Sequence, residues 1–350
     1  MPKQDKPVAI CLIGGSGRSG TTILRTILAR HPDVASFPTE TRFLIDPDGL
    51  IDFYDSVLAG WSPYVYDAKV RRLKKLLGDV GSREVAFGLG RPKNDPRPTR
   101  DGVARAGTRV DRAVSLVRES LKTSRLLPRY FNVNLSKSCP EWAQHVDRLV
   151  DELVEFSFPA RWTGTPRWEE SRQVVGPRHD VSIEDALGGF FRSVMACVAH
   201  RQGASHVVED SPYNHLSFDR TLALVPEARL VHIYRDPRDV VASMTKMNWG
   251  PSDPIDGAKL YAEIFNAWTT VKEHLPAGSY IEISLEELVV ETRNVLGRVC
   301  DFFDLPWDDV LLDVDLGASN QGRWQVDIPD AALGQVERLL ADPLQQGNYA

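Results

Sequence analysis

A glycine-rich stretch, GGSGRSGTT at residues 14–22, constrains the fold of this 350-residue chain more than any other segment. The apolar run VAICLI at residues 8–13 precedes it and predicts a short buried strand. Residues 21–30 follow with apolar side chains at helical spacing, which predicts a helix. A strand, a glycine-rich loop and a helix in this order aim backbone N–H groups and the positive end of the helix at one point. The stretch therefore predicts an anion site in an α/β domain.

The loop differs in one position from the phosphate-binding pattern G-x-x-x-x-G-K-[ST]. Gly15 and Gly20 have the right spacing, but Thr21 stands where the pattern has lysine. A kinase needs that lysine on the β- and γ-phosphates, together with ligands for Mg²⁺. Arg18, the strong cation within the loop, can instead hold phosphate or sulfate oxygens in a fork without a metal. The residues expected to bind the anion, without a metal ion, are Gly17, Arg18, Ser19, Gly20, Thr21 and Thr22.

The composition indicates a folded globular enzyme, with 42% hydrophobic residues. The four cysteines, Cys11, Cys139, Cys197 and Cys300, lie far apart and form no C-x-x-C pair. We therefore expect them to be reduced and buried, with neither a disulfide framework nor a zinc site. The first residues are not typical of a signal peptide, and no apolar run reaches the roughly 18 residues of a membrane span. A cytoplasmic location is the corresponding expectation.

Charge is distributed unevenly along the chain. The net charge is −6, yet residues 61–130 hold 17 Lys and Arg against seven Asp and Glu. This basic part is either a solvated, arginine-rich helical region or an electropositive wall beside an anionic acceptor. Nucleic acid is not an expected partner, because no known reader motif is present and the whole chain is acidic. No feature of the sequence indicates an oligomeric state.

Short apolar strands alternate with helices in the second half of the chain. Strands are predicted at residues 205–208, 230–234 and 280–283, and helices at 182–201, 238–247, 257–274 and 285–303. This alternation predicts an α/β fold with a mostly parallel central sheet and helices on both faces. We expect one domain over residues 1–350, in which residues 61–180 form a largely helical insert with an amphipathic helix near 110–127. Ligands gather at the carboxyl ends of such strands.

Two further segments could bind phosphate. In YRDPRDVVASM, Arg235 follows a predicted strand and Ser243 lies eight residues later, in the next predicted helix. The two could hold a second phosphate, although an Arg-Asp pair at a helix start is also commonly structural. The third segment, NQGRWQVDIP at residues 320–329, contains Arg323 and Trp324. An arginine beside an aromatic ring can bind phosphate and stack on a base.

These three segments together resemble the sulfotransferases that use 3′-phosphoadenosine 5′-phosphosulfate (PAPS) as donor. RSGTT resembles their 5′-phosphosulfate loop, Arg235 and Ser243 match their 3′-phosphate motif, and GRW resembles their C-terminal nucleotide-binding segment. The stretch SLEELVVETRNVLGRVCDFFDLPW also resembles the C-terminal half of the family. The resemblance covers roughly residues 8–45 and 182–330 and implies the P-loop sulfotransferase fold.

Among these enzymes, the tyrosylprotein sulfotransferases and their bacterial counterparts are the most similar. GRSGTTILRTILARHPDVASFPTETR resembles their N-terminal core, and GRWQVDIP resembles a later motif with arginine where lysine is usual. The resemblance implies that Glu40 is the catalytic base and that Arg42 lies at the acceptor site. It implies transfer of a sulfuryl group from PAPS to an acceptor hydroxyl without a metal. Arg18 would neutralise the charge that develops on the leaving 5′-phosphate.

One position departs from the family pattern. Glu209 and Asp210 stand where these enzymes have a lysine that stabilises the leaving oxygen. This departure keeps open a catalytically idle protein that binds the nucleotide. A small-molecule kinase with a phosphate loop is a second alternative function. His215 is the alternative base, because the cytosolic branch of the family uses a histidine. The acceptor could be a phenol, a peptide tyrosine, a sugar, a lipid or another metabolite hydroxyl, and residues 61–180 are expected to lie on its side of the site.

Overall fold

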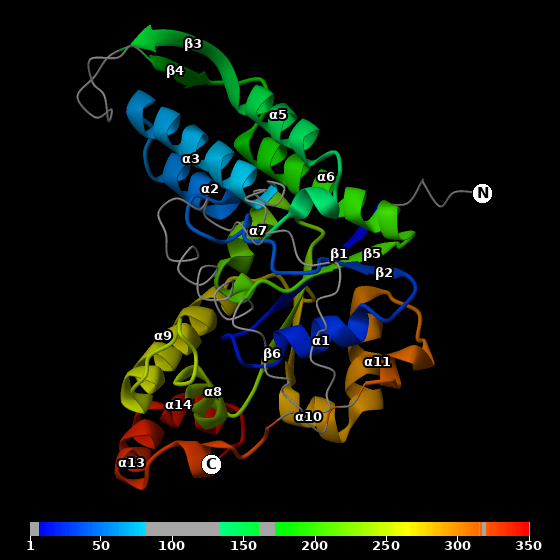
Figure 1. Ribbon diagram of the computed structural model, residues 1–350, viewed down its shortest axis with the longest axis vertical. Coiled ribbons are helices and arrows are strands. Elements are labelled where there is room, and N and C mark those ends of the chain that lie inside the picture. Colours follow the sequence, from blue (N-terminus) through cyan, green and yellow to red (C-terminus); the bar gives the residue numbers. More distant parts are fainter. Residues whose placement is uncertain (1–6, 82–132, 161–171, 315, 317–319, 350) are drawn as a thin grey trace, which may run out of the picture.

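The protein is described from a computed structural model over residues 7–81, 133–160, 172–314, 316 and 320–349. Within these residues a five-stranded sheet forms the centre of the molecule (Figure 1). Its strands, in spatial order, are β2 (Val34–Ser36), β5 (His206–Glu209), β1 (Ala9–Gly14), β6 (Arg229–Tyr234) and β7 (Tyr280–Ser284). Neighbouring strands pair in parallel, so their carboxyl ends lie at one edge. The predicted α/β class and parallel sheet are confirmed.

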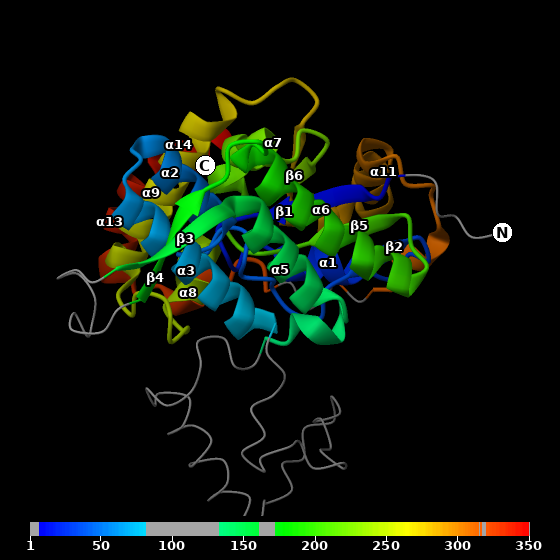
Figure 2. The same ribbon diagram turned by 90° about the horizontal axis from the view of Figure 1, so that it is seen from above.

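Both faces of the sheet are covered, as the continuous apolar strands require. Alternate residues of β1 point to opposite faces, so Leu12 joins one buried cluster and Ile13 joins the other. The first cluster contains residues of α3 (Pro63–Gly81), α5 (Trp142–Leu153) and α6 (Ile183–Gln202). The second contains residues of α1 (Thr21–Leu28) and α11 (Thr292–Phe303). Figure 2 shows α5 and α6 lying side by side over the sheet.

Helix starts follow the signals in the sequence. Ser182 caps α6, because its hydroxyl accepts a hydrogen bond from the backbone N–H of Asp185 at 3.0 Å. Asp236 caps α8 (Pro237–Met244) in the same way, with Pro237 in the first turn. The remaining elements are α2 (Leu50–Ala59), η1 (Leu135–Lys137), η2 (Asn214–Ser217), α7 (Phe218–Leu224), α9 (Pro254–Lys272), η3 (Asp309–Leu312), α12 (Trp324–Asp327), α13 (Asp330–Leu339) and α14 (Ala341–Gln346).

One predicted helix is two helices. Residues 285–303 form α10 (Leu285–Val290) and α11, separated at Glu291, whose φ of −118° and ψ of 44° are not helical. β-branched residues surround the break at Val289, Val290 and Thr292, and such residues lose side-chain freedom in a helix. The expectation of one long helix was therefore wrong, although both pieces bury apolar residues as the pattern predicted.

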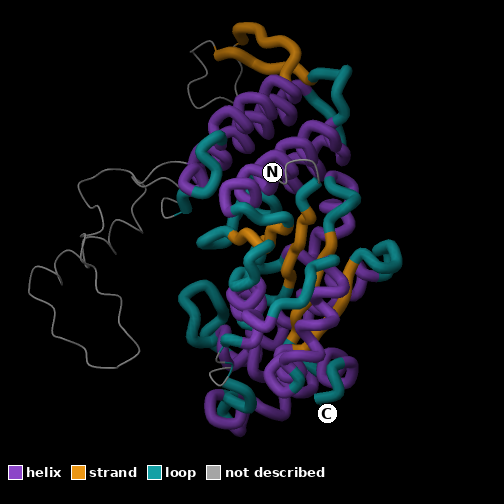
Figure 3. Tube along the Cα trace, turned by 90° about the vertical axis from the view of Figure 1, so that its right-hand side faces the viewer, coloured by secondary structure: helices purple, strands orange, loops and turns teal. Residues whose placement is uncertain are grey.

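The described part of residues 61–180 combines helices with a hairpin. Helices α3 and α5 agree with the predicted helical insert, whereas β3 (Val154–Ala160) and β4 (Arg172–Pro177) form an antiparallel pair that the sequence did not predict. Figure 3 shows this hairpin well apart from the central sheet. The helix predicted near residues 110–127 and the basic stretch 91–100 lie outside the described residues. Helices α3 and α5 share the buried cluster of the sheet, so this region packs as part of one core.

A disulfide between Cys139 and Cys197 corrects the expectation of four reduced cysteines. Cys139 lies between η1 and α5, Cys197 lies on α6, and their Cα atoms are 5.6 Å apart. The bridge joins residues 58 positions apart, and sequence spacing gave no sign that the segment before α5 lies against α6. Cys11 and Cys300 are buried thiols, as expected. Among the described residues, no helix is both long and apolar enough to cross a membrane.

Candidate active site

The glycine loop follows β1 and lies against the end of β6. Gly17, Arg18 and Gly20 have positive φ angles of 67°, 64° and 112°. A Cβ on Gly15 would lie 2.7 Å from the carbonyl oxygen of Ile233, so this position requires glycine. Arg18 has no such freedom, and its left-handed backbone costs about 1 kcal/mol or more. Strain of this kind in a non-glycine residue is concentrated at functional sites.

The loop surrounds a buried hydroxyl that no described residue satisfies. Ser19 is fully buried, and its Oγ has no hydrogen-bond partner among the residues that the structure describes. Buried polar groups in folded proteins are normally paired, so an orphaned hydroxyl beside a helix N-terminus fits an anion ligand. Thr21 and Thr22 begin α1 directly after it. The structure therefore brings the predicted loop residues to one point at the edge of the sheet.

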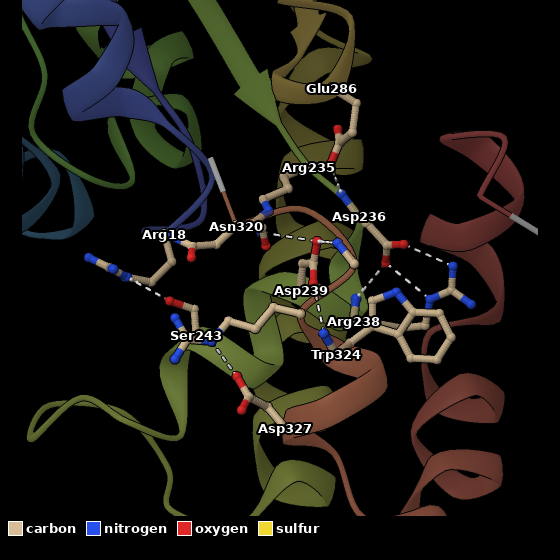
Figure 4. Close-up of polar contacts among 12 residues, drawn as sticks. Arg18, Arg235, Asp236, Arg238, Asp239, Ser243, Glu286, Asn320, Trp324 and Asp327 are labelled. Carbon is tan, nitrogen blue, oxygen red and sulfur yellow. Dashed lines mark hydrogen bonds and ion pairs between the residues drawn. The ribbon is translucent and has the colours of Figure 1, made fainter. Parts of the chain in front are cut away.

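Arg18 connects the loop to the second predicted segment. Its Nε donates a hydrogen bond to Ser243 Oγ at 3.0 Å, across 225 positions of sequence (Figure 4). Arg235 is buried at the end of β6, where its guanidinium pairs with Asp239 at 3.0 Å and donates to the carbonyl of Asn320. Its Nε has no partner among the described residues. The Arg235–Asp239 pair shows that part of this arginine's role is structural.

The third segment is held over the start of α8. The Asp239 carboxylate accepts hydrogen bonds from the backbone N–H groups of Gly322 at 2.8 Å and Trp324 at 2.9 Å. The guanidinium carbon of Arg238 lies 4.1 Å from the centre of a Trp324 ring, a cation–π contact. Arg323 pairs with Asp327 on α12. The segment thus lies beside Arg235, and the arginine that stacks on its tryptophan is Arg238 of α8 (Figure 4).

A pocket of about 450 Å³ contains the predicted base. Glu40 and Arg42 line it together with Thr22, the last residue of the glycine loop. The Glu40 carboxylate pairs with the Arg42 guanidinium, which also lies 3.8 Å from Asp46. Burial raises the pKa of Glu40, and the charge of Arg42 opposes the rise. The structure therefore brings the predicted base and the predicted acceptor-site arginine to the end of the anion loop.

The two acidic residues at the lysine position have different roles. Glu209 is 1% exposed and accepts hydrogen bonds from Thr41 Oγ1 at 2.9 Å and from Asn214 Nδ2 at 2.6 Å. These contacts fix the segment that carries Glu40. Asp210 lines the pocket, and burial, followed by the charge of Glu209, raises its pKa to about 6.

Arg25 is a pocket residue that the sequence prediction missed. Its Nε donates to Asp210 Oδ2 at 2.9 Å, and its Nη1 donates to the carbonyl of Phe37 at 3.2 Å. It lies on α1, three positions after Thr22, and lines the pocket that contains Glu40. Its place in the sequence could have indicated this role, because Arg25 lies one turn after the start of the helix that follows the anion loop.

His215 lies away from this pocket. It is 1% exposed, its ring stacks on His232 with centroids 4.8 Å apart, and burial lowers its pKa well below the usual value. It lines a different cavity, between β6, β7 and α9, in which Trp268 and Glu282 are neighbours. Ser16 of the glycine loop and Arg235 line the same cavity, so His215 lies near the loop but outside the pocket that contains Glu40.

The fold and site define an α/β protein with an anion loop and a carboxylate beside it. Residues 141–309 match the sequence model of the Sulfotransferase family. A Caenorhabditis elegans protein named "Putative protein-tyrosine sulfotransferase" is 25% identical over 135 residues, which are 37% of this chain and 51% of that protein. An "Uncharacterized protein" from Aquifex aeolicus is 25% identical over 114 residues, which are 31% of this chain and 15% of that protein. The chain thus spans about half the length of one of these curated relatives and 15% of the other.

Solved structures of similar shape bear related names. The sulfotransferase domain of the Synechococcus PCC 7002 olefin synthase is 16% identical with a TM-score of 0.44, over 97% of this chain and 89% of that one. A sulfotransferase from Mycobacterium tuberculosis H37Rv is 12% identical with a TM-score of 0.44, over 96% of this chain and 77% of that one. The family match over residues 141–309 confirms the resemblance to sulfotransferases predicted from the sequence.

Proposed function

We propose that the protein is a sulfotransferase that moves a sulfuryl group from PAPS to an acceptor hydroxyl. The observation that carries the proposal is the shared pocket of Glu40 and Thr22, which joins a carboxylate to the end of the anion loop. The family match over residues 141–309 supports the reaction class. Neither observation identifies the donor, which is proposed from the fit of the loop and the two further segments.

The donor site would use three parts of the chain. Backbone N–H groups of the loop and the unpaired Ser19 hydroxyl suit the 5′-phosphosulfate. Ser243 and Arg235, whose Nε is buried and unpaired within the described residues, suit the 3′-phosphate. The segment that contains Trp324 lies beside them and would contact the nucleotide.

In the proposed reaction, Glu40 accepts the proton of the acceptor hydroxyl as its oxygen forms a bond to sulfur. The bond between sulfur and the bridging oxygen of the donor breaks, and its electrons remain on the leaving 5′-phosphate. Arg18 and the loop N–H groups neutralise the charge that develops there. The products are adenosine 3′,5′-bisphosphate, a sulfate ester and protonated Glu40, which returns its proton to water. The elevated pKa of Glu40 makes it a better base than an exposed glutamate.

Arg25 supplies the positive charge that the missing lysine would otherwise bring. Asp210, at the lysine position, would make the pocket more anionic and would repel a sulfuryl donor. The Arg25 guanidinium compensates that carboxylate at 2.9 Å and itself lines the pocket. Arg25 would therefore act as a positioning and charge-compensating residue, while Arg18 contacts the donor.

The acceptor is proposed to be a phenol or a peptide tyrosine. The name of the Caenorhabditis elegans relative and the presence of Arg42 in the pocket support this class. Incubation with PAPS and a panel of phenols, tyrosine peptides, sugars and lipids should release adenosine 3′,5′-bisphosphate with a phenolic acceptor. Release with the sugars or lipids alone would contradict the acceptor class. Absence of release with the whole panel, together with tight nucleotide binding, would favour the idle nucleotide-binding alternative.

A further inference from the structure

A group of two cysteines and a histidine lies outside the proposed active site. We propose that, when its cysteines are reduced, the protein binds one zinc ion through Cys139, Cys197 and His145. One ligand atom from each of the three residues lies within 4.8 Å of the others. Two thiolates and one imidazole are typical zinc ligands. The site would be structural, since the proposed transfer reaction uses no metal.

The backbone already holds the three ligands in place. His145 lies on α5, six positions after Cys139, and Cys197 faces them from the adjacent helix α6. A tetrahedral zinc ion with bonds of about 2.0–2.3 Å separates its ligand atoms by about 3.3–3.8 Å. The 4.8 Å limit on the three ligand atoms therefore leaves only side-chain rotations to complete the geometry. Buried Cys139 is fixed by the core, so the half-buried partners His145 and Cys197 would adjust.

Two more observations indicate a ligand at this place. His145 Nδ1 is buried and has no hydrogen-bond partner among the described residues. A buried ring nitrogen normally has a partner, and a metal ion could provide one. Glu141 Oε2 lies 3.0 Å from Cys197 Sγ, so this carboxylate adjoins the group without belonging to the three ligands, and water could complete the coordination. A cavity of about 500 Å³, lined by Glu141, His145, Cys197 and His200 among others, gives an ion access from solvent.

The disulfide and the zinc site exclude each other. In the structure both sulfurs are used in the Cys139–Cys197 bond, whereas metal binding requires two free thiolates. Either arrangement ties the segment before α5 to α6. Val133, six positions before Cys139, lines the pocket that contains Glu40. The site therefore anchors one wall of the proposed acceptor pocket.

Cobalt titration of the reduced protein tests the proposal. The full chain is reduced with a phosphine, freed of metal and titrated without oxygen, using Co²⁺ as a coloured substitute for zinc. We expect one equivalent to bind, with thiolate-to-cobalt charge-transfer absorption and a tetrahedral ligand-field band that zinc abolishes. His145→Ala should weaken binding by about 100-fold or more, because even loss of an outer partner costs about 10–100-fold. Cys197→Ser should remove the charge-transfer band or halve it.

His200→Ala is the matched control, because His200 lines the same cavity but is not one of the three ligands. His145→Ala retains both cysteines, and formation of the disulfide on oxidation shows that this variant folds. A folded, reduced protein that takes up no Co²⁺ or Zn²⁺ would overturn the proposal. So would binding that is unchanged in both His145→Ala and Cys197→Ser, or binding that His200→Ala abolishes.

Discussion

The donor side and the acceptor side of the proposed site are built in different ways. On the donor side, Ser19 and Arg235 are 0% and 6% exposed. Arg235 directly follows β6, and Ser19 lies in the loop between β1 and α1. On the acceptor side, the side chains of Glu40 and Arg42 are 31% and 37% exposed and lie in the irregular segment after β2. A rigid strand edge suits a constant nucleotide, whereas loops can vary with the acceptor. Substitutions should therefore separate the two functions.

The largest effect should come from the acceptor side. Glu40→Gln removes the proposed base and keeps the size of the side chain, so turnover should fall about 100- to 10,000-fold. The dissociation constant for adenosine 3′,5′-bisphosphate should stay within about threefold, because Glu40 lies outside the predicted donor segments. Steady-state kinetics and calorimetry measure the two quantities. Unchanged turnover in Glu40→Gln would refute the assigned base.

Loss of Arg25 should lower both the stability of the protein and its turnover, because Arg25 is the ion-pair partner of Asp210. Arg25→Met leaves a buried carboxylate without its partner, which should cost about 1–3 kcal/mol of unfolding free energy and reduce turnover. The double variant Arg25→Met, Asp210→Asn removes both charges and should recover most of the stability. Urea denaturation measures the stability of both. Equal losses in the single and double variants would show that the Arg25–Asp210 contact does not matter.

The same carboxyl group gives a pH-dependent prediction. The pKa of Asp210 is raised from 3.8 to about 6 in the folded protein, so the folded state holds a proton that the unfolded state releases. Stability from this group is fully present below about pH 4 and is lost as pH rises towards 6, by at most about 3 kcal/mol. In urea denaturation, the unfolding free energy of Asp210→Asn should change less than that of the wild type between about pH 4 and 6. Parallel curves for the two proteins would contradict the raised pKa.

The smallest effects should come from exposed residues of the donor side. Ser243→Ala should weaken binding of adenosine 3′,5′-bisphosphate by about tenfold, the value of one hydrogen bond. Arg323→Ala should change it by less than about threefold, because this exposed arginine pairs with Asp327. Calorimetry compares the two variants. A larger loss in Arg323→Ala would show that Arg323 turns from Asp327 to the nucleotide.

Local sequence patterns predicted the strand, loop and helix starts that form the donor side. The glycine loop, the start of α1 and the caps of α6 and α8 depend on residues within a few positions of one another. The register Leu12↔Leu230 then brings the ends of β1 and β6 to one edge, as parallel pairing requires. This arrangement lets Arg18 contact Ser243, two residues that the family resemblance had assigned to the 5′-phosphosulfate and the 3′-phosphate of the donor.

Long-range packing set the limits of prediction. The Arg25–Asp210 pair joins residues 185 positions apart, and the Cys139–Cys197 bridge joins the segment before α5 to α6 across 58 positions. The hairpin of β3 and β4 was missed although VEFSFPA alternates apolar and polar residues, and its Phe156 and Phe158 are exposed instead of facing a core. The break at Glu291 shows that an apolar period can continue across two helices.

Calorimetric binding of adenosine 3′,5′-bisphosphate and of ADP, each with and without Mg²⁺, tests the central claim most directly. We expect tight, metal-independent preference for the 3′,5′-bisphosphate, and Arg235→Ala should abolish that preference. Tighter binding of ADP that requires Mg²⁺ would refute the proposed donor site and would indicate a kinase-like protein.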